Sequence, residues 1–90
     1  MNNKVILESL SMDLLRVALG YHRGSIKMAE RFQEEALKRK NEVDINSVKP
    51  YIKTHLSNME KTLLYSDTNR KAEDALMYST LLRNYCTTNL

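Results

Sequence analysis

At 90 residues the chain is long enough for one domain, residues 1–90, and too short for a catalytic domain joined to a regulatory one. With 42% hydrophobic and 28% charged residues it resembles globular proteins, which argues against disorder. The net charge of +3 is compatible with nucleic-acid binding but does not indicate it, and the single cysteine, Cys86, excludes an intramolecular disulfide and a cysteine-rich metal site.

The composition indicates an all-α fold. Two glycines and one proline are too few for the frequent turns of an all-β chain, and strong helix formers dominate. We therefore predict a small antiparallel helical bundle. The apolar run Val5–Leu7 is too short for a signal-peptide core or a membrane span, so the expected compartment is the cytoplasm.

A first helix is predicted over residues 3–42. At about 100° per residue its apolar side chains fall on one face both before and after Gly20 and Gly24. A loop at the glycines would not keep the apolar positions before and after it in the same helical phase. We therefore favour one long helix, and hence a three-helix bundle. The alternative is a four-helix bundle broken at Gly20–Gly24, with Ser25 capping the next helix, since each interior glycine costs about 1 kcal/mol.

Two shorter helices are predicted over residues 47–65 and 68–86. The turn-forming segment 41–47 precedes the first of them, with Ser47 as its N-cap and Pro50 in its first turn. The segment SDTN then separates the two helices, with Asp67 or Thr68 as the cap of the second.

The lengths of these helices predict a homodimer. Two short antiparallel helices would cover only residues 22–42 of the long helix and would leave its more apolar N-terminal half without a partner. That half carries a row at spacings of 3 and 4, as in a coiled coil, which we predict as the dimer interface: Leu7, Leu10, Leu14, Val17 and Tyr21. In the four-helix alternative the same leucines form an internal core.

A basic stripe on the opposite side of the first helix indicates a second possible function. It could contact the phosphates of a nucleic acid, with Tyr21 or Tyr51 stacking on bases. Glutamates interspersed among these cations favour an ordinary solvated face instead. The residues of the basic stripe are Arg16, Arg23, Lys27, Arg31 and Lys38.

Arg16 and His22 resemble the R-x(4–6)-H motif of HEPN-domain ribonucleases. In that family the arginine and the histidine act on the RNA backbone at a dimer interface. The resemblance covers the segment 16–22 alone, and Val17 stands where the family usually has a polar residue.

The leading hypothesis is therefore a non-enzymatic helical interaction or adaptor module that self-associates through its first helix. A protein partner is expected, and no membrane. No cofactor or metal is expected, because neither histidine has a second ligand at the spacing that brings ligands together on one helix. A nucleic-acid-binding protein using the basic stripe is the alternative, and a HEPN-like ribonuclease is the third hypothesis.

Overall fold

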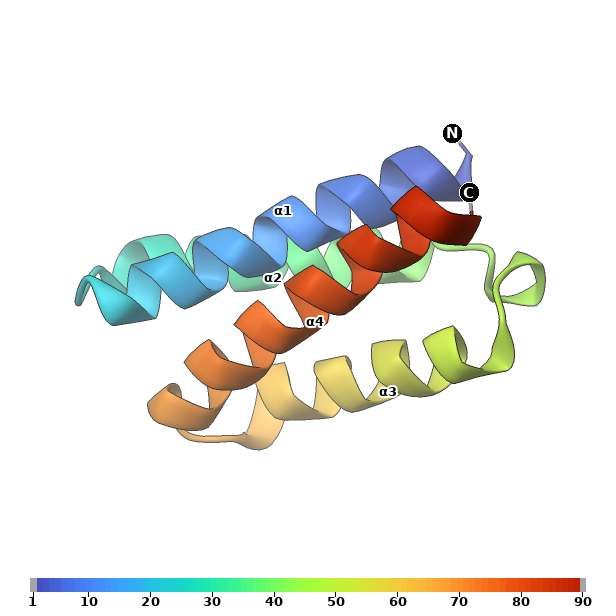
Figure 1. Ribbon diagram of the computed structural model, residues 1–90. Helices are drawn as coiled ribbons and strands as arrows, with labels where there is room; N and C mark the ends of the chain where they lie inside the picture. Colours follow the sequence, from blue (N-terminus) through green and yellow to red (C-terminus); the bar gives the residue numbers. More distant parts are fainter. Residues whose placement is uncertain (1, 90) are drawn as a thin grey trace.

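The computed structural model describes residues 2–89, and over this range it is an all-α bundle without strands (Figure 1). This confirms the predicted fold class in its four-helix form. A short 3₁₀ turn, η1, interrupts the connection between the second and third helices. The elements are α1 (Asn3–His22), α2 (Ile26–Glu42), η1 (Ile45–Ser47), α3 (Pro50–Tyr65) and α4 (Thr68–Asn89).

The predicted continuous helix over residues 3–42 is wrong, because the chain reverses between α1 and α2. Gly24 has φ +72°, a left-handed conformation that glycine adopts without steric cost. The amide of Ser25 donates to the carbonyl of Gly20 at 2.8 Å, and that of Gly24 donates to the carbonyl of Tyr21 at 3.3 Å. Together these bonds form a Schellman motif, which satisfies the last carbonyls of α1 and ends the helix.

Gly20 has a different role from Gly24, because α2 crosses α1 directly above it. A Cβ built at Gly20 would lie 2.8 Å from the backbone nitrogen of Ala29. The glycine therefore permits close packing of the hairpin. The apolar stripes on its two sides stay in phase because both arms of the hairpin face the same core, and not because one helix continues through them.

The other helix boundaries follow local capping chemistry. α3 begins at Pro50 with Lys49 as its N-cap, three residues later than predicted, because Ser47 lies in η1. Asp67 caps α4 as predicted, since its side chain accepts a hydrogen bond from the amide of Arg70 at 2.8 Å. α4 extends past its predicted end and reaches Asn89.

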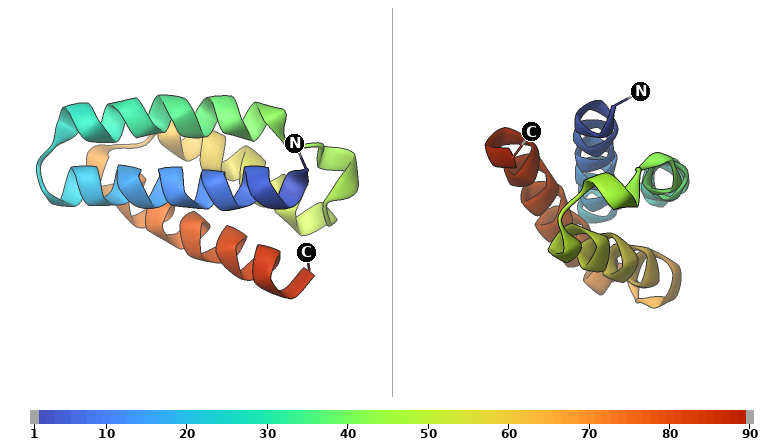
Figure 2. Two further views of the ribbon diagram at one scale, coloured as in Figure 1. Left: turned by 90° about the horizontal axis from the view of Figure 1, so that it is seen from above. Right: turned by 90° about the vertical axis from the view of Figure 1, so that its right-hand side faces the viewer.

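α1 is the central helix of the bundle and runs antiparallel to both α2 and α4 (Figures 1 and 2). α3 packs mainly against α4. The N-terminal half of α1 therefore has intrachain partners, which corrects the predicted packing. The largest fully buried side chains are Leu7, Leu10, Leu14, Val17, Ile52, Leu56, Met59, Leu63 and Leu82.

Candidate interaction surface

The residues predicted as a dimer interface lie inside a single chain. Leu7, Leu10, Leu14 and Val17 are each 0% exposed. Tyr21 is partly buried, and its hydroxyl donates to Oε1 of Gln33 on α2 at 3.3 Å. Burial, and secondarily the charge of Glu30, raises the pKa of this phenol. Because these side chains already have intrachain partners, they cannot be the contact surface of the folded protein. Any homodimer needs another surface.

The face of α1 that points away from the core carries a second apolar row. Val5 and Met12 are 43% and 44% exposed, and Leu15 and Leu19 are partly exposed. Val5, Met12 and Leu19 are each seven residues apart, which is about two helical turns, so they lie on one side of α1. We call these four residues the outer row.

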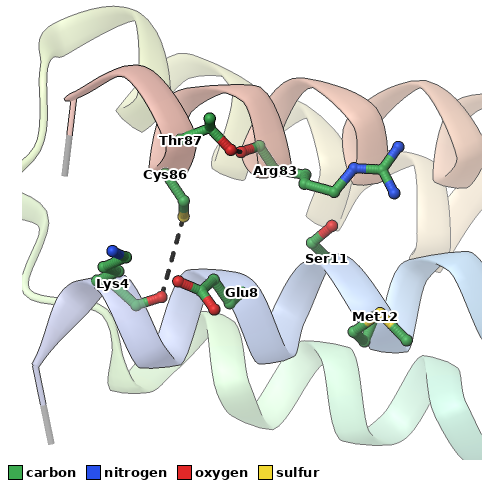
Figure 3. Close-up of a pocket in the computed structure, with 7 residues that line it drawn as sticks. All are labelled: Lys4, Glu8, Ser11, Met12, Arg83, Cys86 and Thr87. Carbon is green, nitrogen blue, oxygen red and sulfur yellow. Dashed lines mark hydrogen bonds between the residues drawn. The ribbon is translucent and has the colours of Figure 1, made fainter.

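A groove with a volume of about 420 Å³ lies beside the outer row, between the start of α1 and the end of α4 (Figure 3). Met12 belongs to both the row and the groove. The charged groups of Lys4, Glu8 and Arg83 line it, so it combines an apolar wall with charges of both signs. Its remaining lining residues are Ser11, Cys86 and Thr87.

Two serines set the approach of α1 to α4 next to the groove. The hydroxyl of Ser11 donates to the carbonyl of Ser79 at 2.7 Å, and the hydroxyl of Ser79 donates to the carbonyl of Ser11 at the same distance. Both side chains are buried, and these bonds satisfy their polar atoms within the core. The only sequence signal for this contact is a small polar residue inside each apolar stripe.

Cys86 is a buried free thiol at the end of the groove. Its sulfur lies 3.9 Å from the carbonyl oxygen of Lys4. Burial raises the pKa of the thiol, the charge of Glu8 raises it further, and that of Lys4 opposes the shift. A raised pKa disfavours the reactive thiolate, so this buried cysteine acts as a packing residue.

A second, smaller groove of about 240 Å³ lies at the opposite end of the α1–α4 pair. Among the described residues, its lining contains the carboxylate of Glu73 and no lysine or arginine, whereas the first groove contains Lys4 and Arg83 beside the carboxylate of Glu8. The lining also includes the apolar side chain of Leu76, which is 46% exposed. The outer row therefore runs between a groove with two basic side chains and one acidic side chain and a groove whose carboxylate is that of Glu73. The other residues that line the second groove are Tyr21, His22, Thr68, Asn69 and Ala72.

The predicted basic stripe is divided between α1, the turn and α2. Arg16 on α1 and Arg31 on α2 both pack on the ring of Phe32, with guanidinium carbons 5.2 and 5.8 Å from the ring centroid. Arg23 lies in the turn between the helices, and Lys27 and Lys38 are on α2. The structure therefore brings together two of the five cations, around an aromatic residue that the sequence analysis did not single out.

A buried carboxylate next to this pair was not predicted. Asp13 is 4% exposed and accepts a hydrogen bond from Nε of Arg39 at 2.9 Å, which ties α1 to α2. Arg16 lies 3.8 Å from the other carboxylate oxygen. The hydrogen bond to Asp13 raises the pKa of Arg39, so the guanidinium stays charged at neutral pH. In the sequence, Asp13 looks like a solvated residue because its partner is 26 positions away.

Arg16 and His22 contact different parts of the fold. Arg16 packs on Phe32 of α2, whereas His22 lines the second groove with residues of α4. The structure therefore does not assemble these two side chains into one site. Among residues 2–89, no three histidine, cysteine, aspartate or glutamate side chains are placed to hold a metal ion together.

None of the helices in the described part of the chain has the length and apolar character needed to cross a membrane. No protein-family model, curated protein or solved structure matches this chain.

Proposed function

We propose that this protein is a non-enzymatic helical interaction or adaptor module that self-associates through the outer row of α1. The observation that carries the proposal is the exposure of Val5 and Met12, at 43% and 44%, on the helix whose other sides are packed against α2 and α4. Apolar side chains exposed along one side of a helix are a feature of interaction sites, here with the charged residues Glu8 and Arg16 on the same side of α1. The proposed compartment is the cytoplasm, where a reducing environment keeps a single cysteine such as Cys86 as a thiol.

The size of the exposed row determines how tight the association can be. Full burial of an aliphatic side chain is worth about 1.5–3 kcal/mol, so a side chain that is already more than half buried gains about 1 kcal/mol. Two copies of a four-residue row gain several kcal/mol, against which the lost rotational and translational freedom must be set. We therefore expect a concentration-dependent dimer with a Kd that is roughly micromolar or weaker.

Sedimentation equilibrium over a wide range of protein concentration tests the proposal. The mass should rise from one chain to twice the 10.5 kDa of a chain. Met12→Glu should keep the protein monomeric, because it places a charge in the middle of the row. Ser57→Glu, on the exposed face of α3, is the matched control and should dimerise like the wild type. A wild-type protein that stays monomeric throughout overturns the proposal.

Binding of single-stranded nucleic acid is the second candidate function, and the packing of Arg16 and Arg31 on Phe32 favours it. Guanidinium groups held against a ring offer both charge and a flat surface to a nucleotide. Arg31→Ala should then weaken the binding of a labelled oligonucleotide, and added salt should weaken it steeply. Lys53→Ala on α3 is the control. Equal losses in the two variants contradict a specific role of Arg31.

A further inference from the structure

The outer row has a symmetry that determines how a second copy can bind; this inference rests on the proposed self-association. Val5 and Leu19 stand at equal distances on the two sides of Met12, about 10 Å along the helix in each direction. An antiparallel second copy centred on Met12 therefore brings Val5 of each chain opposite Leu19 of the other. The contact is then the same from both sides, as a two-fold homodimer requires.

The packing of α4 on α1 extends this symmetry to the flanking charges. Ser79 lies level with Ser11, and Cys86 lies level with Lys4. The two-fold axis of this dimer lies in the contact between the two α1 helices and is perpendicular to both of them at Met12. It keeps α4 on the same side of both copies and reverses its direction. Arg83 of one copy then lies at the same position along α1 as Glu73 of the second copy, and this pair occurs twice in the dimer.

The charges on this face favour the antiparallel arrangement over a parallel one. Arg83 and Glu73 are both exposed, and within residues 2–89 neither forms an ion pair. In a parallel dimer the two-fold axis would run along α1 and would place the two α4 helices on opposite sides of the contact, so Arg83 of one copy could not pair with Glu73 of the other. In the antiparallel dimer the groove that contains Lys4, Arg83 and Glu8, with one more basic than acidic side chain, meets the end of the second copy that carries Glu73.

The first groove also gains an apolar occupant in this arrangement. The groove extends from Lys4 to Met12 along α1, and Val5 lies within this span. Leu19 of the second copy arrives at the level of Val5, next to the groove. We propose that a second copy of this chain binds antiparallel across a two-fold axis at Met12, with Leu19 of each copy at the groove of the other and Arg83 paired with Glu73.

Cysteine cross-linking in a Cys86→Ala background tests the orientation. Met12→Cys should form a disulfide-linked dimer under mild oxidation, because the axis places this residue opposite itself. Val5→Cys should not cross-link with itself, but it should cross-link when mixed with Leu19→Cys. If Val5→Cys cross-links efficiently with itself and not with Leu19→Cys, the dimer is parallel and the inference is wrong.

Charge reversal tests the polar pair separately. Arg83→Glu and Glu73→Arg should each weaken dimerisation about tenfold, because each creates two like-charge contacts. The double variant should recover most of the wild-type affinity, whereas Lys53→Glu on α3 should change nothing. Without recovery in the double variant, the assigned pair is wrong. A dimer that Met12→Glu dissociates, but that lacks this recovery and the Val5–Leu19 cross-link, refutes the arrangement and leaves the proposed function standing.

Discussion

Replacing Gly20 by alanine distinguishes the hairpin of α1 and α2 from a continuous helix, because the two structures predict effects of opposite sign. In the hairpin, the new Cβ would lie 2.8 Å from the nitrogen of Ala29 and 2.9 Å from its Cα and Cβ. Carbon atoms normally approach to about 3.5 Å, so the helices must separate by several tenths of an ångström. In a continuous helix the same change would stabilise the protein by about 1 kcal/mol.

The expected cost follows from these contacts. Overpacking typically costs about 1–3 kcal/mol, and the upper end applies here because the opposing atoms belong to the backbone and Cβ of Ala29, which have no rotamer freedom. The better helix propensity of alanine offsets about 1 kcal/mol. We therefore expect Gly20→Ala to lower the free energy of unfolding by about 2 kcal/mol and the Tm by roughly 8–16 °C.

Urea denaturation followed by circular dichroism measures this change, with a midpoint that should fall by roughly 1–2 M at an unchanged m-value. Gly24→Ala is the matched control. Gly24 has φ +72°, and no neighbouring atom lies within 4 Å of the position that a Cβ would take, so alanine there adds only backbone strain, about 1 kcal/mol. If both alanine variants are more stable than the wild type, the helix is continuous and the hairpin is refuted.

Three further predictions concern the core and its ionisable groups. Leu14→Ala should cost about 2–5 kcal/mol of stability without dissociating a dimer, as sedimentation and urea denaturation can show, because Leu14 is 0% exposed within one chain. Asp13→Asn should destabilise the protein by about 1–3 kcal/mol through the weakened bond to Arg39, and adding Arg39→Gln to that variant should cost little more in urea denaturation if the two residues share one interaction. Burial, and secondarily the charge of Asp74, raises the pKa of the phenol of Tyr78 on α4, as burial raises that of the Cys86 thiol. The unfolded chain therefore loses these protons at a lower pH than the folded protein, so urea midpoints should fall as the pH rises above about 9, and Tyr78→Phe should flatten the decline.

Much of the local structure follows directly from the sequence. The scarcity of glycine and proline and the periodicity of the apolar residues predict an all-α bundle, which the structure confirms. Asp67 was identified as a possible cap of α4 because its side chain can accept a hydrogen bond within its own turn. Helix formation and helix capping depend on residues that are a few positions apart, so they can be predicted from the sequence.

The candidate surface was harder to predict, because it depends on which apolar row faces the core. α1 carries one row that includes Leu10 and Leu14 and another that includes Val5 and Met12, and both have spacings typical of a helix interface. With residues 3–42 taken as one helix, the first row lacked an intrachain partner and became the predicted dimer interface. The return of α2 and α4 along α1 buries it and leaves the second row exposed.

The sequence by itself determined the helical class, because helix propensity and apolar periodicity act over a few turns of one segment. Only the tertiary structure decided the meaning of Gly20 and Gly24. A glycine inside a helical pattern is compatible with three structures: an uninterrupted helix, a left-handed C-cap or a close crossing of two helices. Which of them forms depends on the segments that pack against the glycine from elsewhere in the chain. The same holds for the pairing of Ser11 with Ser79, 68 residues apart, because such contacts form only after the bundle has brought α1 and α4 together.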